Sequence, residues 1–309
     1  MRAVFVDANG ALAETAERLR RADDMSLHIN LQPDVKPADL PDVMGDADIA
    51  LIDHTALPTD IARQCTGLRH VVFLGTGARS YMDPEELADI GIKVHTIKGY
   101  GDTAVAEMTI ALMWAAAKGL AHMDGGMRAG QWHRTGGLQL TGKTLGLIGF
   151  GGIAAEVARL AGGMRVIAWN RTPKTHPGVE FVQIEQLFAE SHVVSMHLLL
   201  TDETRGFLSA ERLSRMRPGA ILVNTARGAL VDETAMVAAL ESKHLGHAAL
   251  DVFHEEPLPP DHPLSKLPNT TLSAHSAFRT VEATDNLIEA ALEHCRRLSL
   301  VLPKVLSHS

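Results

Sequence analysis

The chain has 309 residues, of which 46% are hydrophobic, and its 37 acidic residues outnumber 29 basic ones to give a formal net charge of −8. This length suits two ordinary domains with buried cores, and the composition argues against wholesale disorder. An acidic chain without a basic stripe argues against a nucleic acid partner, and two cysteines, Cys65 and Cys295, are too few for a disulfide framework or a zinc ribbon.

The N-terminus and the longest apolar stretch bear on where the protein is found. The first ten residues, MRAVFVDANG, indicate a strand and a turn and lack the parts of a secretory signal peptide. The stretch Met108–Met123 is interrupted by Lys118 and is shorter than a bilayer span, which favours a buried helix over the alternative of a membrane helix. With so few cysteines, these features predict a cytoplasmic protein without a membrane partner.

Short strand-like runs alternate with helical patterns over the first part of the chain. Alternation of this kind predicts parallel strands joined by crossover helices. The expected strands lie at Ala3–Val6, Ser26–Leu31, Ile49–Ile52, His70–Phe73 and Lys93–Thr96. One long helix is then expected from about Thr103 to Arg128.

A second series of strands follows that helix. Helices are expected between these strands, for example at Ile153–Leu160 and Glu233–Leu240, and a last helix at Val281–Leu298 has no strand after it. The strands are expected at Leu145–Ile148, Arg165–Trp169, Val193–Leu198, Ala220–Asn224, His247–Val252 and Thr270–Ser273. The pattern predicts two parallel sheets, one after the other in the sequence.

A glycine-rich loop stands between the first strand and the first helix of the second series. In GFGGIA, Gly149, Gly151 and Ala154 occupy the three positions of G-x-G-x-x-G/A. The first glycine permits a tight turn, the second admits a pyrophosphate close to the backbone, and the small third residue lets helix pack on strand. The strand before and the helix after it favour dinucleotide binding over a mere glycine-rich turn.

Three chemically active side chains follow strands of the second series. Arg227 lies in NTARG, Glu256 in HEEP and His275 in SAHSAF, each beyond the carboxyl end of an expected strand. Ligands bind at this edge of open α/β sheets. Taken singly, the three could be a strand cap, a solvated acid and a polar loop residue, but their joint occurrence in this order favours an active site.

These residues and several spaced motifs resemble the D-isomer-specific 2-hydroxyacid dehydrogenase family over almost the whole chain. The resemblance implies α/β architecture with two doubly wound parallel-sheet domains, in which a Rossmann cofactor domain (99–276) is inserted into a flavodoxin-like substrate domain (1–98 and 277–309). It also implies a homodimer, with the long helix as the dimer element. The further motifs are AVAEMTIALM from Ala104, GQW from Gly130, LTDETRGFL from Leu200 and MRPGAILVNTARG from Met216.

The resemblance implies reduction of a 2-keto acid, a reaction that the three side chains suit chemically. Arg227 can grip carboxylate and carbonyl oxygens with its planar fork of donors. His275 can deliver a proton, because imidazole ordinarily titrates near neutral pH. Glu256 can accept a hydrogen bond from the imidazole, orient it and favour its charged form.

In this family a glycine loop of the substrate domain holds the substrate carboxylate, and the match here is Leu74, Gly75, Thr76 and Gly77. The chain departs from the family nearby, because Arg79 stands where an acidic residue is common. Trp132 and Arg279 are further pocket candidates, although each can equally be structural. These differences leave the identity of the keto acid open.

The resemblance also implies a set of cofactor contacts around the glycine loop. Two positions differ from the family: Gly101-Asp102-Thr103 replaces an Asn ahead of VAE, and Gly152 stands where Arg or Asn is frequent. The expected cofactor-binding residues are Gly149, Gly151, Gly152, Ile153, Asn170, Arg171, Thr172, Thr225 and Asp251.

The segment VIAWNRTPK bears on which nicotinamide cofactor is used. An NAD enzyme places Asp or Glu about 20 residues past the first glycine, to bind the ribose 2′-hydroxyl. This chain has Asn170 there, then Arg171 and Thr172, with Lys174 close behind. Arg171 can pair with a 2′-phosphate, and the missing acid removes a repulsion, so the segment predicts NADPH over NADH. The alternative is a solvated turn whose cation touches nothing.

The remaining histidines offer no convincing metal spacing, since His244 and His247 lack an evident third ligand. We therefore expect an enzyme without a metal, acting on a small keto acid such as glyoxylate or hydroxypyruvate. The alternative function is a dinucleotide-sensing regulatory protein of the corepressor type, which keeps the fold with little turnover.

Overall fold

A computed structural model describes residues 1–301, and the chain divides into two compact units. Unit 1 begins with Met1–Gly101 and resumes at Thr280, whereas unit 2 is the intervening Asp102–Arg279. These limits fall a few residues beyond the boundaries expected from the sequence. The end of the predicted 277–309 segment, residues 302–309, lies outside the described residues.

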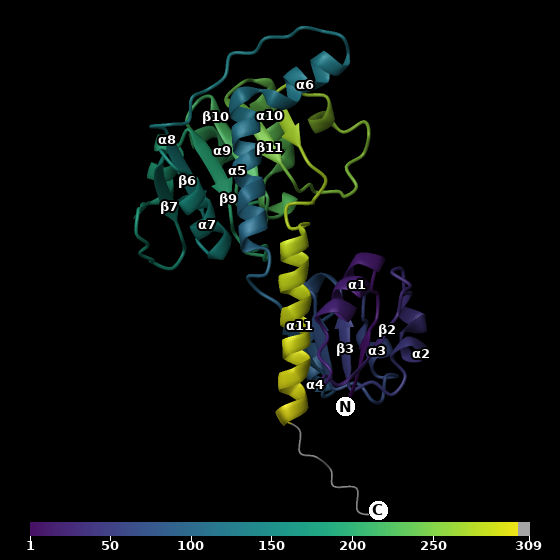
Figure 1. Cartoon of the computed structure of the whole chain (residues 1–309). Helices are drawn as coiled ribbons and strands as arrows, with labels where there is room; N and C mark the ends of the chain where they lie inside the picture. Colours follow the sequence, from purple (N-terminus) through teal and green to yellow (C-terminus); the bar gives the residue numbers. More distant parts are fainter. Residues whose placement is uncertain (302–309) are drawn as a thin grey trace, which may run out of the picture. The chain divides into compact units, whose positions relative to one another are not determined.

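Unit 1 is built on a five-stranded parallel sheet with the order β2-β1-β3-β4-β5 (Figure 1). This is the flavodoxin-like order. The strands are β1 (Arg2–Phe5), β2 (Ser26–Ile29), β3 (Ile49–Ile52), β4 (His70–Phe73) and β5 (Lys93–Thr96). The helices are α1 (Gly10–Leu19), α2 (Leu40–Met44), α3 (Thr59–Ala62), α4 (Pro84–Asp89) and α11 (Val281–Val301).

Alternate residues of β3 explain how the sheet of unit 1 is covered. Ile49 and Leu51 pack in the cluster that contains α1 and α11, whereas Ala50 and Ile52 pack with α2, α3 and α4. Because successive side chains point to opposite faces, an uninterrupted apolar run indicates a strand buried on both. The helix α11 is also held by Arg296, which donates to Asp24 at 2.7 Å and keeps the pKa of that carboxyl below its usual range.

Unit 2 contains a seven-stranded parallel sheet with the order β12-β11-β10-β9-β6-β7-β8. The first six strands in sequence take the Rossmann order, and β12 (Thr270–Leu272) extends the sheet beside β11. The other strands are β6 (Thr144–Ile148), β7 (Arg165–Trp169), β8 (Val179–Phe181), β9 (Val193–Met196), β10 (Ala220–Asn224) and β11 (Leu245–Leu250). The helices are α5 (Asp102–Lys118), α6 (Leu120–Arg128), α7 (Gly152–Leu160), α8 (Ile184–Glu190), α9 (Ala210–Arg215) and α10 (Glu233–Glu241).

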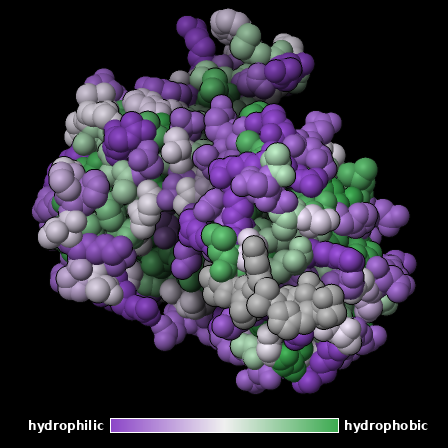
Figure 2. Space-filling view, turned by 60° about the horizontal axis from the view of Figure 1, so that its bottom comes forward, coloured by the Kyte–Doolittle hydropathy of each residue, from purple (hydrophilic) through white to green (hydrophobic). Residues whose placement is uncertain are grey.

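The two sheets confirm the predicted fold class, and β8 is a strand that the sequence did not reveal. It has three residues, follows a Pro-Gly turn and pairs only with β7 at the edge of the sheet. Helices α5 and α7 pack in the core cluster on one face, and α8, α9 and α10 in the other. On the surface seen in Figure 2, hydrophilic residues predominate and hydrophobic ones form smaller groups, as is usual for folded proteins.

The expected single helix over 103–128 is wrong, because Gly119 breaks it into α5 and α6. Gly119 has φ +62°, and a Cβ there would lie 2.8 Å from the Thr135 hydroxyl, so this position requires glycine. Within residues 1–301, no single helix is long and apolar enough to cross a membrane. Among these described residues, α5 and α6 reach the required length and apolar character only when taken together, and the two helices are bent by 70° relative to each other.

Candidate functional site in unit 2 and the loop after β4

The glycine loop turns at the carboxyl end of β6, where the strand order of unit 2 reverses between β6 and β9. Gly149 has φ +88°, and a Cβ there would lie 2.8 Å from the backbone oxygen of His197. Gly151 caps α7 without any side-chain hydrogen bond to the first turn. A pyrophosphate site requires a glycine with positive φ, a loop packed closely on its neighbour and a helix whose first amides are not capped by a side chain. These residues have all three features and therefore fit a dinucleotide.

Asn170 connects the end of β7 to this loop. Its Oδ1 accepts a hydrogen bond from the Phe150 amide at 3.0 Å, and its Nδ2 donates to the Thr172 carbonyl at 2.7 Å. Lys174 reaches the same loop, since its Nζ donates to the Phe150 carbonyl at 2.6 Å. Arg171 instead forms an exposed ion pair with Glu203 at 2.7 Å. The end of β7 thus holds the middle of the glycine loop through an amide and a cation.

The side chains of Thr225 and Asp251, two further predicted cofactor contacts, are engaged within the protein. The Thr225 hydroxyl hydrogen-bonds that of Thr109 on α5 at 2.8 Å. Asp251 is wholly buried, and its Oδ2 accepts from the Ala277 amide at 2.9 Å. The sequence did not reveal that Asp251 anchors the loop that carries His275, whose amide donates to the Asp251 carbonyl at 2.8 Å.

His275 and Glu256 form a hydrogen-bonded pair at the carboxyl ends of β11 and β12. The distance from His275 Nδ1 to Glu256 Oε2 is 2.6 Å, and Glu256 Oε1 accepts from the Phe253 amide at 2.9 Å. An ionised carboxylate only accepts, so Nδ1 carries the proton and Nε2 is left for another partner. His275 has φ +46°, a backbone state that is uncommon for a residue other than glycine.

Arg227 follows β10 on a neighbouring turn. Asn224 holds that turn, because its side chain donates to the Arg227 carbonyl at 2.9 Å and accepts from the Ala226 amide at 3.0 Å. A Cβ on Gly228 would fall 2.1 Å from the backbone of Phe253, so this turn packs directly against the turn that precedes Glu256. The Arg227 side chain is exposed, and its Nη1 donates to the Ala226 carbonyl at 2.6 Å.

The predicted substrate loop, Leu74 to Gly77, follows β4 in unit 1. Gly75 has φ +153°, and its carbonyl accepts from the Ile97 amide at 3.0 Å. Leu74 is buried in the core, whereas Thr76 is exposed. The Leu74 side chain is therefore withdrawn into the core, and Thr76 is the residue of this loop that lies at the surface.

The other candidates for the pocket lie at the surface of their units. Arg79 is ion-paired with Glu85, Trp132 is 76% exposed, and Arg279 is exposed.

Two half-buried histidines have other roles. His197, below the glycine loop, bonds Ser195 at 2.9 Å, and His247 bonds Thr271 at 2.9 Å. Burial lowers the pKa of each imidazole to about 4, which keeps both neutral at physiological pH. His244 contacts the Leu213 carbonyl instead. Among residues 1–301 no group of three or more His, Cys, Asp or Glu side chains is placed to hold a metal ion.

Comparison with known proteins assigns the family. Residues 110–277 match the model of the D-isomer specific 2-hydroxyacid dehydrogenase NAD binding domain. A glyoxylate reductase of Aeropyrum pernix is 40% identical over 250 residues, which are 76% of this chain and 74% of that protein. A hydroxypyruvate reductase of Thermotoga maritima is 36% identical over 250 residues, or 78% and 81% of the two chains.

A solved structure agrees with these relatives. An acyclic imino acid reductase, determined with NADPH and D-Arg, superposes with a TM-score of 0.83 at 26% identity and covers 97% of this chain and 98% of its own. The relatives named here carry enzyme names and give no support to the corepressor alternative. The protein belongs to the D-isomer specific 2-hydroxyacid dehydrogenase family and is a nicotinamide-dependent oxidoreductase of that class.

Proposed function

We propose that the protein reduces small 2-keto acids, with glyoxylate and hydroxypyruvate as first candidates, and uses NADPH in preference to NADH. The observation that carries the proposal is the 2.6 Å pair between His275 and Glu256, on turns that pack beside the Arg227 turn. The names of the relatives from Aeropyrum pernix and Thermotoga maritima support the choice of substrates.

The proposed chemistry divides the reaction among three side chains. A bound nicotinamide cofactor supplies the hydride for the keto carbon. The imidazolium form of His275 gives its Nε2 proton to the keto oxygen, while Glu256, held by the Phe253 amide, accepts from Nδ1 and fixes the orientation of the ring. Arg227 binds the carboxylate of the substrate, and backbone amides of the Leu74–Gly77 loop assist it.

A panel of keto acids tests the proposed activity. Purified protein is mixed with NADPH and glyoxylate, hydroxypyruvate, pyruvate or a branched keto acid, and oxidation of the cofactor is followed by absorbance. We expect the highest kcat/KM with glyoxylate or hydroxypyruvate, the substrates in the names of the relatives, and the lowest with the branched keto acid, which has the largest side chain. A preference for a branched keto acid would contradict the proposed substrates, and a protein that turns over none of them would contradict the activity.

His275→Ala should lower kcat by about 10²–10⁴-fold, the usual contribution of a general acid. His275→Asn serves as a second variant, because asparagine tolerates the left-handed backbone at this position. The matched control is His262→Ala, which removes the imidazole of another His–Glu pair, 3.1 Å from Glu233, and should leave kcat nearly unchanged. Near-wild-type turnover by both His275 variants would show that the acid is misassigned.

The proposed NADPH preference rests on the end of β7. No carboxylate stands at Asn170 to repel a 2′-phosphate. Arg171 is paired with Glu203, but both side chains are more than 70% exposed, and such surface pairs contribute only about 0–1 kcal/mol, so a phosphate can replace Glu203. Lys174 adds a second cation that already contacts the glycine loop.

Arg171→Ala should raise the KM for NADPH by about tenfold or more and change the KM for NADH little, because only NADPH loses a charge-assisted hydrogen bond. The matched control is Arg165→Ala at the other end of β7, where Arg165 pairs with Glu180 and Glu190. Steady-state kinetics with both cofactors give the change in KM for NADPH relative to the change in KM for NADH. A wild-type kcat/KM with NADH that equals or exceeds that with NADPH would refute the preference.

We further infer a homodimer that uses α6 and the segment after it. Three large apolar side chains there, Leu120, Met127 and Trp132, are 55%, 59% and 76% exposed. Large apolar side chains that are exposed close together in the sequence favour an association surface here. Light scattering at micromolar concentration should give twice the chain mass, and Met127→Lys should shift the protein toward monomer, whereas Leu31→Lys, at another exposed leucine, should not. A monomeric wild-type protein would contradict the inference.

A further inference from the structure

A carboxylate stands at the N-terminal end of α7, and the proposed reaction does not use it. Asp102 is the first residue of α5, which packs against α7. A Cβ added to Gly152, the first residue of α7, would lie only 1.8 Å from Asp102 Oδ2. The Asp102 side chain therefore occupies the space that a larger residue at position 152 would enter, directly beside the second glycine of the loop.

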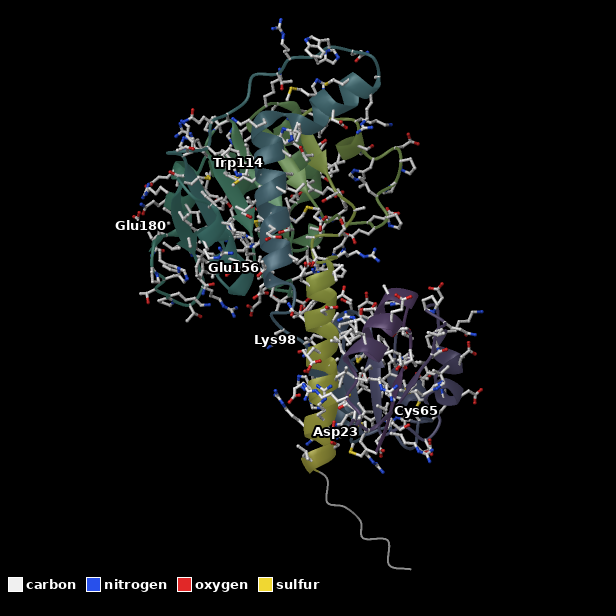
Figure 3. All side chains as sticks on the ribbon, in the orientation of Figure 1. Asp23, Cys65, Lys98, Trp114, Glu156 and Glu180 are labelled. Carbon is white, nitrogen blue, oxygen red and sulfur yellow. The ribbon has the colours of Figure 1, made fainter. Side chains whose placement is uncertain are left out.

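The surroundings of Asp102 do not neutralise its charge. Burial raises the pKa of the Asp102 carboxyl, and the like charge of Glu156 raises it further. Glu156 lies on α7 beside α5 (Figure 3) and is paired with Arg159 at 2.8 Å. Glu107 of α5 also acts on Arg159, so this cation is already shared by two acids.

We propose that the Asp102 carboxylate weakens dinucleotide binding at the glycine loop and that the bound state takes up a proton from solvent onto Asp102. The inference rests on the proposed cofactor role of that loop. The first amides of α7 attract anions, and no side chain caps them. A pyrophosphate and an ionised Asp102 would thus carry like charge at the same helix end, and protonation of Asp102 removes the repulsion.

The direction of the pH dependence follows from this repulsion. In the free protein Asp102 loses its proton as pH rises through its already raised pKa, and a bound dinucleotide raises that pKa further. The dissociation constant is therefore constant below the first pKa. It rises by up to about tenfold per pH unit between the two pKa values and levels off above the second.

Direct binding measurements without substrate test the proposal. NADPH and NADH are each titrated by isothermal calorimetry from about pH 5 to about pH 8, in buffers of different ionisation enthalpy that report proton uptake. Asp102→Asn should tighten binding on the order of tenfold at the upper end of this range, flatten the pH profile and abolish the proton uptake. Glu241→Gln, at the exposed end of α10, also removes one negative charge. It should leave the affinity, the pH profile and the proton uptake unchanged.

A second variant keeps the test decisive if Asp102→Asn folds poorly. Glu156→Gln leaves Asp102 in place and should move the pH window of proton uptake downward, because it removes a like charge. Unchanged or weaker binding by folded Asp102→Asn, or an unshifted window in Glu156→Gln, overturns the proposal. The binding experiment contains no keto acid, so its outcome does not depend on the proposed substrate. Because NADPH and NADH are both measured, a wrong NADPH preference would appear as a difference between the cofactors and not as a loss of the Asp102 effect.

Discussion

Asp251 is the buried carboxylate on which the geometry of the His275 loop depends. Its two oxygens accept hydrogen bonds from the Ser273 hydroxyl at 2.5 Å and from the amides of Ser276 at 3.1 Å and Ala277 at 2.9 Å. Its backbone carbonyl accepts from His275 itself. A buried carboxylate without donors would be costly, but here the donors that stabilise it also fix the loop and offset the unfavourable backbone of His275.

Close backbone packing completes this arrangement, and glycines make it possible. Gly228 lets the turn after β10 press on the backbone of Phe253, whose amide in turn holds Glu256. Gly149 likewise lets the glycine loop pack against the backbone of His197, the residue after β9. A methyl group at either position would force the neighbouring backbone to move, so the site depends on contacts between main chains as much as on its reactive side chains.

The strand-like runs and their turns were sufficient to predict five strands to the residue: β3, β4, β5, β7 and β10. All but the edge strand β5 carry a run of buried apolar residues, which is the signal of a strand covered on both faces. These runs could not predict the break at Gly119, because the apolar pattern continues past this residue and does not show that it takes a left-handed backbone conformation with φ +62°. They also missed β8, a strand of only three residues that pairs with β7 at the edge of the sheet.

The residues of the candidate site could be proposed from the sequence, but most of the side chains that contact them could not. The resemblance to the family implied that Glu256 would orient His275, and the two are hydrogen-bonded. No local pattern indicates that Arg171 pairs with Glu203 or that Asp251 serves the His275 loop, because these contacts join segments that are distant in sequence. The sequence also offered no reason for glycine at position 152. The structure gives one, because a side chain there would collide with the Asp102 carboxylate.

The insertion of unit 2 within unit 1 bears on the order in which the two cores are completed during translation. All of unit 2 is synthesised before α11, the last helix of unit 1. Leu287, Ile288 and Leu292 of α11 pack in the same core cluster as β1 and α1, and Arg296 pairs with Asp24. Strand β1 therefore keeps part of one face uncovered until unit 2 and α11 have both been synthesised, so the core of unit 1 is completed after unit 2 has been made.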